Sequence, residues 1–315
     1  MSRPHAVVTG GAGFVGSHLV DTLLEDDYRV TSLDNFGSGR LQNLAHIEDD
    51  AFQSIKHDVR EPFPDFNTVD LIYHFASRAS PKEFASHAVE IALTNANGSH
   101  HAFECAREHD ARVVLASTSE VYGDPEVHPQ TEAYNGNVNV RGPRAPYDES
   151  KRFSEALAVA YDQQYDIDIR TVRIFNTYGP RMRPDDGRVI PNFFSQALAG
   201  DDLTVYGDGS QTRSFCYVSD LIEGIRAAAE APPETLSGTV VNLGSTDERT
   251  IRELAEIVLE IVDTESGIVY EDLPEDDPEV RRPDLTKVTD LTGWEPSVEL
   301  RDGLTRTLNY LRAQY

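Results

Sequence analysis

The chain has 315 residues, of which 39% are hydrophobic and 26% charged, and its 54 acidic residues against 28 basic ones give a formal net charge of −26. This length is enough for one large domain, or for a nucleotide-binding domain with a smaller partner. Because so negative a surface repels phosphates, and because no apolar run reaches the roughly 18 residues of a membrane span, we expect no nucleic-acid or membrane partner.

Short β-branched runs alternate with longer helical patterns through the first 178 residues. The short runs predict strands at 5–9, 28–33, 52–57, 69–74, 111–116 and 168–174. The longer patterns predict helices near 14–25, 84–109 and 147–165. This alternation indicates an α/β fold, a doubly wound parallel sheet of the Rossmann type, with 1–178 as its nucleotide-binding domain.

From Asn176 onward, glycine and proline separate shorter elements. We therefore predict a smaller C-terminal substrate-binding region made of residues 179–236 and 266–315. The apolar run 240–243 is expected to return to the first sheet, so that 237–265 count with the nucleotide-binding domain. The acidic segment 271–278 is predicted to be an exposed loop.

A glycine-rich turn follows the first predicted strand, with Gly10, Gly13 and Gly16 at intervals of three. Glycines there let the backbone approach a pyrophosphate, whose charge is held by amides at the start of the next helix. Asp34 ends the second strand, where a carboxylate binds both ribose hydroxyls and repels a 2′-phosphate, so NAD is favoured over NADP. A glycine kept only for packing is the alternative. The other residues expected at this cofactor site are Phe14, Val15, Asn35, Asp58, Val59, Ala76 and Ser117.

Tyr147 and Lys151 lie four residues apart on one predicted helix and face the same way. A neighbouring ammonium, with the positive nicotinamide ring, favours the phenolate and brings the tyrosine pKa towards working pH. Both side chains are therefore predicted to be catalytic and to contact the cofactor. Thr118 follows the fifth strand and is placed to hydrogen-bond the reacting hydroxyl. A solvated helix face is the alternative for the Tyr147–Lys151 pair, and the upstream glycine turn weighs against it.

These motifs together resemble the extended short-chain dehydrogenase/reductase family, and the resemblance covers essentially the whole chain. It implies that Thr118, Tyr147 and Lys151 oxidise a sugar C4 hydroxyl while hydride passes to NAD⁺. Subfamilies differ in the residues after the threonine: a 4,6-dehydratase carries Asp-Glu there, and a UDP-galactose 4-epimerase has a small residue in place of Glu120. The Ser119-Glu120 pair is instead similar to UDP-glucuronate decarboxylases. Further stretches similar to that subfamily are 115–130, 173–176, 179–182, 186–189, 209–213 and 276–284.

The resemblance also implies a substrate side, in which Arg281 lies near the substrate carboxylate; a one-residue error would give this role to Arg282. Glu120 is expected near the sugar ring, with a loop or capping role as its alternative. Arginine forks suit the phosphates of a UDP-sugar, although they can equally balance surface carboxylates. The remaining predicted substrate contacts are Ser119, Asn176, Arg188, Val189, Tyr206 and Arg213.

Two positions depart from the subfamily pattern near the expected sugar pocket. Arg78 stands where a proline is expected, and the segment 82–87 lacks the usual aromatic character. We nevertheless expect NAD-dependent decarboxylation of UDP-glucuronate to UDP-xylose through a 4-keto intermediate. The alternatives are a nucleotide-sugar 4-epimerase or dehydratase on the same scaffold and, at a greater distance, a non-catalytic NAD(H)-binding sensor.

Assembly, location and environment are also expectations. The resemblance implies a homodimer paired through the helix 147–165. The N-terminus enters a strand without a signal peptide, and the two cysteines suggest neither a disulfide framework nor a metal site, so a cytoplasmic protein is favoured. Lysine occurs only four times, and a carboxylate-rich, lysine-poor surface is typical of a halophilic protein; an ordinary acidic protein is the alternative.

Overall fold

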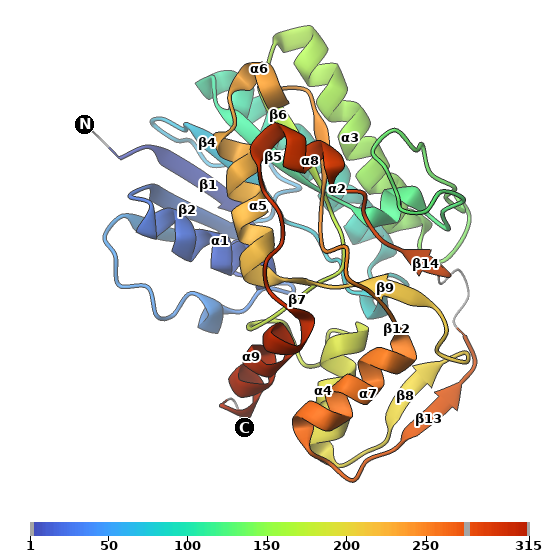
Figure 1. The fold of residues 1–315 in the computed structure, drawn as a ribbon. Helices are drawn as coiled ribbons and strands as arrows, with labels where there is room; N and C mark the ends of the chain where they lie inside the picture. Colours follow the sequence, from blue (N-terminus) through green and yellow to red (C-terminus); the bar gives the residue numbers. More distant parts are fainter. Residues whose placement is uncertain (1–2, 274–277, 314–315) are drawn as a thin grey trace.

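The computed structural model describes residues 3–273 and 278–313. Its central layer is a seven-stranded parallel sheet with the order β11-β6-β5-β4-β1-β2-β3 (Figure 1). In chain order its strands are β1 (His5–Thr9), β2 (Arg29–Asp34), β3 (Phe52–Lys56), β4 (Leu71–His74), β5 (Arg112–Thr118), β6 (Ile169–Ile174) and β11 (Val240–Leu243). All seven were expected from the sequence, β11 as the strand that returns.

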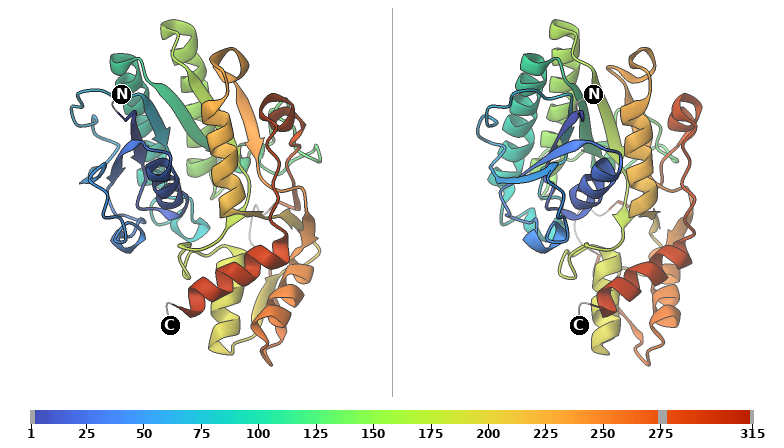
Figure 2. Two further views of the ribbon diagram at one scale, coloured as in Figure 1. Left: turned by 60° about the vertical axis from the view of Figure 1, so that its left-hand side comes forward. Right: turned by 90° about the vertical axis from the view of Figure 1, so that its left-hand side faces the viewer.

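Helices cover both faces of this sheet (Figures 1 and 2). On one face α1 (Phe14–Glu25) contacts α5 (Val218–Glu230), and on the other α2 (Ala88–His109) packs along α3 (Ala145–Tyr165). The central strands are fully buried, as the run Val113, Val114 and Leu115 illustrates at 0% exposure. Continuous apolar strands are what a sheet covered on both faces requires, and the predicted Rossmann-type fold is confirmed.

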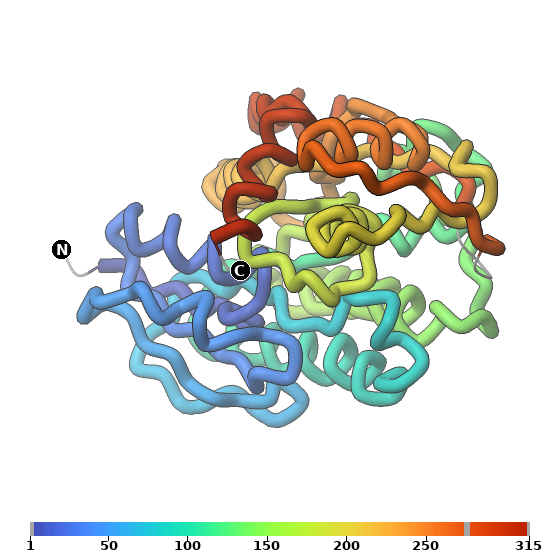
Figure 3. The backbone as a smooth tube through the Cα atoms, turned by 90° about the horizontal axis from the view of Figure 1, so that it is seen from below, coloured from blue at the N-terminus to red at the C-terminus, as the bar shows by residue number. Residues whose placement is uncertain are grey.

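A smaller lobe lies against the carboxyl ends of these strands. Its helices α4 (Val189–Ala199) and α7 (Ile251–Val262) pack on β8 (Leu203–Tyr206), which pairs with β13 (Ile268–Glu271). Helix α9 (Leu300–Arg312) packs on α7, and seen from below the yellow-to-red C-terminal chain lies beside the blue-to-green N-terminal chain (Figure 3). The remaining elements are β7 (Thr177–Tyr178), β9 (Thr212–Ser214), β10 (Cys216–Tyr217), β12 (Glu248–Thr250), β14 (Val280–Arg281), α6 (Pro233–Leu236), α8 (Thr286–Thr292) and the 3-10 turns η1 (Leu41–Asn43), η2 (Pro81–Glu83) and η3 (Ser119–Tyr122).

Two helices pack differently from the prediction. The sequence assigns α5 to the substrate-binding region, yet α5 contacts α1, β5, β6 and β11. It assigns α7 to the nucleotide-binding domain, yet α7 contacts α4 and β8. Periodicity shows that a helix has an apolar face, as Leu221, Ile225 and Ala228 give α5, but it does not show which layer that face covers. The domain boundaries therefore remain a proposal in which α5 counts with the sheet and α7 with the smaller lobe.

Three other expectations concern the surface and the cysteines. Of the predicted exposed acidic loop 271–278, Asp272 and Leu273 are exposed, but Glu271 is the last residue of β13 and Pro278 is buried, while residues 274–277 lie outside the described part of the chain. Cys105 and Cys216 are both free and buried. Within residues 3–273 and 278–313, no helix combines the length and the apolar character needed to cross a membrane.

Candidate active site

A cavity of about 490 Å³ opens where the carboxyl ends of the parallel strands face the smaller lobe. This is the edge at which doubly wound sheets bind their ligands. With one exception, Asp58, every residue that the sequence assigns to cofactor or substrate lines this cavity. They are Gly10, Gly13, Phe14, Val15, Gly16, Asp34, Asn35, Val59, Ala76, Ser117, Thr118, Ser119, Glu120, Tyr147, Lys151, Asn176, Arg188, Val189, Tyr206, Arg213 and Arg281.

The glycine turn forms a cradle that larger residues would fill. Gly10 adopts a φ of +71°, and a Cβ atom there would lie 2.9 Å from the backbone of Ala76. A Cβ atom on Gly16 would lie 2.2 Å from the carbonyl oxygen of Gly10, so the first turn of α1 can approach the loop only without a side chain. A strand, a bare turn and a helix N-terminus in this order fit the pyrophosphate of a dinucleotide.

Asp34 closes the next strand and is almost fully buried. Its Oδ2 accepts a hydrogen bond from the Ala12 amide at 3.0 Å, and its Oδ1 accepts one from the Phe36 amide at 2.7 Å. Burial raises the pKa of Asp34, and the two amides oppose that rise. The carboxylate is therefore fixed beside the glycine turn, in the position expected for a ribose contact.

Asp58 is the predicted cofactor residue that does not line the cavity, and its contact with the cofactor stays a prediction. The Arg60 side chain binds both of its carboxylate oxygens, at 2.9 and 2.6 Å, and this pairing holds the pKa of Asp58 well below its usual range. Asn35 donates a further hydrogen bond to it at 3.3 Å. Asp58 thus organises the loop after β3, and its neighbour Val59 reaches the cavity instead.

Tyr147 and Lys151 both point into the buried end of the cavity from α3. Burial raises the pKa of Tyr147 to about 12, and a hydrogen bond with Thr118 opposes that rise. Burial lowers the pKa of Lys151 to about 8, and its Nζ donates to the carbonyl oxygen of Ala116 at 2.8 Å. These protein groups by themselves leave Tyr147 a phenol at neutral pH, and the predicted lowering of its pKa by Lys151 together with the nicotinamide ring stays a prediction.

Glu120 lies beside these groups on η3 and carries two guanidinium partners. Arg281 from β14 bonds its Oε1, and Arg144 lies 2.6 Å from its Oε2. Burial alone would raise the pKa of Glu120, but the two arginines outweigh it and lower that pKa to about 2. Arg281 is 3% exposed, whereas the Arg282 side chain is 37% exposed and lies near Glu248, so Arg281 is the arginine that faces the site.

Sequence reasoning missed Arg144 and Phe84, which both line the cavity. The Arg144 guanidinium lies 5.5 Å from the centre of the Phe84 ring, and that ring stacks on Tyr147. Arg144 precedes Tyr147 by three residues, a spacing that places it on the same helical turn. Phe84 belongs to the segment 82–87, which the sequence marks only as a departure from the subfamily.

The polar substrate-side residues are held by neighbouring backbone. Arg188 donates to the carbonyl oxygen of Ala79 at 2.7 Å, and the buried Arg213 donates to that of Thr212 at 2.8 Å. Tyr206 is 40% exposed. The cavity thus presents guanidinium groups from the smaller lobe towards the sheet, which suits a ligand with phosphate charges.

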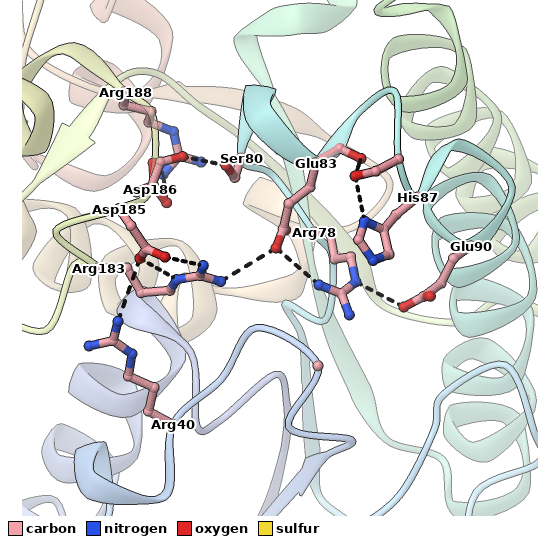
Figure 4. A network of polar contacts seen from close by, with 12 residues as sticks. Arg40, Arg78, Ser80, Glu83, His87, Glu90, Arg183, Asp185, Asp186 and Arg188 are labelled. Carbon is pink, nitrogen blue, oxygen red and sulfur yellow. Dashed lines mark hydrogen bonds and ion pairs between the residues drawn. The ribbon is translucent and has the colours of Figure 1, made fainter.

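A chain of ion pairs crosses from the sheet to the smaller lobe along this cavity (Figure 4). Arg78 binds Glu90 at 2.8 Å and Glu83 at 3.1 Å. Glu83 is also paired with Arg183 at 3.4 Å. Both departures from the subfamily pattern, Arg78 and the segment that contains Glu83, are therefore parts of one network.

The same network continues to the loop beside the glycine turn (Figure 4). Asp185 pairs with Arg183 at 2.9 Å and with Arg40 at 3.6 Å, and the Arg40 amide donates to the carbonyl oxygen of Ala12 at 2.9 Å. We call this set of pairs, from Glu90 to Arg40, the interlobe ion-pair chain. It links both sides of the cavity mouth through side chains alone.

The NAD-dependent epimerase/dehydratase family matches residues 6–244. A protein named UDP-glucuronic acid decarboxylase 1 from Xenopus tropicalis is 47% identical over 313 residues, which are 99% of this chain and 73% of the relative. UDP-glucuronic acid decarboxylase 6 from Arabidopsis thaliana is 48% identical over 305 residues, 96% of this chain and 87% of the relative.

Solved structures of similar proteins have the same overall fold as this chain. UDP-glucuronic acid 4-epimerase from Bacillus cereus, as a mutant in complex with a fluorinated UDP-glucuronic acid and NAD, has a TM-score of 0.90 at 27% identity, covering 99% of this chain and 100% of that one. A dTDP-glucose 4,6-dehydratase from Streptomyces venezuelae with NAD bound has a TM-score of 0.87 at 30% identity, covering 98% and 97%. The chain therefore belongs to the NAD-dependent epimerase/dehydratase family of extended short-chain dehydrogenases/reductases.

Proposed function

We propose that this protein decarboxylates UDP-glucuronate to UDP-xylose in an NAD-dependent reaction. The observation that carries the proposal is the pair of the buried Arg281 with the partly buried Glu120 beside Tyr147 and Thr118. It adds a guanidinium that can bind a sugar carboxylate to the groups that oxidise C4. The names of the relatives, which are nearly half identical over almost the whole chain, support the same substrate.

The chain supplies proton transfer and orientation. The glycine turn and Asp34 would hold NAD, which would supply the oxidation and later reduction at the sugar C4. Tyr147 removes the C4 hydroxyl proton, and Thr118 hydrogen-bonds that oxygen and the tyrosine. The 4-ketone lies β to the carboxylate, so the C5–C6 bond breaks and its electron pair enters an enolate as CO₂ leaves. A proton added at C5 converts the enolate back to a 4-ketone, and Tyr147 returns its proton to O4 as C4 is reduced, which gives UDP-xylose.

Lys151 and Arg281 support these steps electrostatically. The Lys151 ammonium, fixed on the Ala116 carbonyl, favours a negative charge on the cavity side of α3. Arg281 bonds Glu120 and the Gly123 carbonyl oxygen through its two terminal nitrogens, while its Nε is buried without a hydrogen bond to any residue that the structure describes, so its guanidinium can also bind a carboxylate. In a protein of net charge −26, the positive charges of Lys151 and Arg281 provide a local attraction for an anionic nucleotide sugar.

A substrate panel read by mass spectrometry tests this function. UDP-glucuronate, UDP-glucose and UDP-galactose are each incubated with enzyme and NAD⁺, without an added reductant. The proposal expects UDP-pentose from UDP-glucuronate alone. A change of UDP-glucose into UDP-galactose would indicate the rival 4-epimerase, and binding of NAD(H) without turnover of any substrate would indicate a sensor.

We also infer a homodimer paired through α2 and α3. Val89 and Leu93 on α2 are 73% and 42% exposed, and Phe153 and Val159 on α3 are 51% and 49% exposed. Large apolar side chains gathered on two adjacent helices are typical of an interaction surface. Light scattering after size-exclusion chromatography should give twice the 35.0 kDa chain mass, and Phe153→Glu should lower it to the monomer value.

The setting that we infer is the cytoplasm of a cell with high internal salt. A high internal salt concentration is supported by the excess of 54 acidic residues over 28 basic ones and by the small number of lysines. Two buried cysteines kept as free thiols suit a reducing compartment. Cell fractionation tests the cytoplasmic location. The salt dependence of stability, described in the Discussion, tests the high-salt environment.

A further inference from the structure

Arg144 holds a place in the site that the proposed reaction leaves unexplained. It is the residue before α3, and its carbonyl oxygen accepts the amides of Tyr147 at 3.0 Å and of Asp148 at 3.1 Å. Its backbone is therefore tied to the turn that carries the tyrosine. Its guanidinium reaches across to Glu120 at 2.6 Å. One residue thus links the start of α3 to the carboxylate at the end of β5.

Glu120 is paired with two guanidinium groups. Arg281 takes Oε1 and also donates to the carbonyl oxygen of Gly123 at 3.1 Å, while Arg144 takes Oε2. The three side chains sum to one positive charge in a buried position. A single guanidinium is enough to keep a buried carboxylate paired, so the second one leaves a charge available for another anion.

We propose that Arg144 is a positioning residue: it keeps Glu120 paired and fixed, which frees Arg281 to bind the carboxylate of the substrate. This inference rests on the proposed decarboxylation. When the substrate binds, part of the Arg281 guanidinium forms hydrogen bonds with the sugar carboxylate, and Glu120 remains bound by Arg144. The cluster then holds two carboxylates and two guanidinium groups, which balances its charge.

Without Arg144, binding of the substrate would leave Arg281 alone to pair with both Glu120 and the sugar carboxylate. The groups that face Glu120 are Arg281 from β14, Arg144 just before α3, and Tyr147 and Asp148 from α3. Asp148 is itself a buried carboxyl, whose pKa is raised to about 7 by burial and by the charge of Glu120. A third carboxylate nearby makes the loss of one guanidinium costly, so Glu120 would bind a proton or keep Arg281 for itself.

Arg144→Gln and Arg144→Lys test this inference against Arg141→Gln as the matched control. Arg141 is an exposed residue three positions earlier and loses the same charge without touching the site. We expect the kcat for UDP-glucuronate to fall about 10²-fold in Arg144→Gln, since a misplaced group in a site commonly costs this much. Its kcat should also gain an acid limb above pH 5 that the native enzyme lacks, and Arg144→Lys should restore part of both.

A substrate-free readout separates this inference from the proposed function. In protein labelled with ¹³C at glutamate Cδ, with Glu120 assigned from Glu120→Gln, the Glu120 signal should titrate at higher pH in Arg144→Gln than in the native protein or Arg141→Gln. An unchanged titration and an unchanged kcat profile would overturn the role of Arg144. Failure of the native enzyme to release CO₂ would overturn the proposed function, while the titration would still test the positioning of Glu120. Thermal melting shows whether each variant is folded.

Discussion

The Phe84 ring lies flat against the ring of Tyr147, with centroids 4.9 Å apart and planes inclined by 19°. Both rings are 5% exposed, and Phe84 comes from the turn after β4 whereas Tyr147 comes from α3. A flat neighbour restricts the tyrosine to one orientation, and its apolar face contributes to the burial that raises the tyrosine pKa. The segment that departs from the subfamily pattern therefore supports the predicted catalytic tyrosine directly.

Replacing Phe84 should affect catalysis more than substrate binding. Phe84→Ala removes the stacked face and leaves a cavity, so we expect a loss of about 3–5 kcal/mol in the free energy of unfolding and a fall in kcat. Phe84→Leu keeps most of the volume without the flat face, and should retain most of the stability while kcat still falls. Chemical denaturation and steady-state kinetics measure the two effects. Equal kcat in Phe84→Leu and the native enzyme would contradict the positioning role of the stacked ring.

Asp148 should make stability depend on pH in the direction opposite to an ordinary ion pair. Burial is the largest cause that raises its pKa, to about 7 from a model-peptide value near 3.8. The folded state therefore favours the protonated form, and this contribution is fully present below about pH 4 and is lost as the pH rises to about 7. Asp148→Asn mimics the protonated acid, so it should raise the melting temperature at pH 8 and much less at pH 4.5. The same increase at both pH values would contradict the assignment.

The interlobe ion-pair chain should slow the exchange of NAD. Arg183 pairs with both Glu83 and Asp185, so Arg183→Gln breaks the chain at its centre. Partly exposed ion pairs contribute up to about 1 kcal/mol each, so we expect NAD to dissociate about two- to tenfold faster. Stopped-flow displacement of the bound nucleotide measures this rate. Arg301→Gln, which removes an exposed pair with Glu260, is the control and should leave the rate unchanged.

Salt should stabilise the protein as a whole. At low ionic strength the net charge of −26 repels itself, and the Debye length shortens from about 30 Å at 0.01 M to about 3 Å at 1 M. We therefore expect the melting temperature to rise steadily from 0.01 to 1 M KCl. A constant or falling melting temperature over this range would favour an ordinary acidic protein.

The order of the main strands and helices through β6, and the return of β11 to the sheet, could be predicted because each of these elements carries its own local pattern. The glycine turn, Asp34, Thr118 and the Tyr147–Lys151 spacing are also local, and the structure brings them to one cavity. All these signals lie within a few residues along the chain, where periodicity and turn chemistry act.

Contacts between distant segments could not be predicted in the same way. Arg144 reaches Glu120 only because α3 packs on β5 and η3, and Phe84 meets Tyr147 only because the fold brings the end of the η2 turn to α3. The pairing of Asp58 with Arg60, two residues away, was also not predicted, and the cofactor contact of Asp58 stays a prediction. The packing of α5 and α7 likewise depends on which surface remains uncovered, which no single segment encodes.

The most direct measurement uses UDP-glucuronate labelled with ¹³C at its carboxyl carbon, incubated with the native enzyme and NAD⁺ in high salt without a reductant. We expect the label to appear as ¹³CO₂ in an amount equal to the UDP-xylose formed, while NADH does not accumulate. Retention of the label in a C4-inverted UDP-hexuronate would contradict decarboxylation and would show that the Arg281–Glu120 pair serves epimerisation.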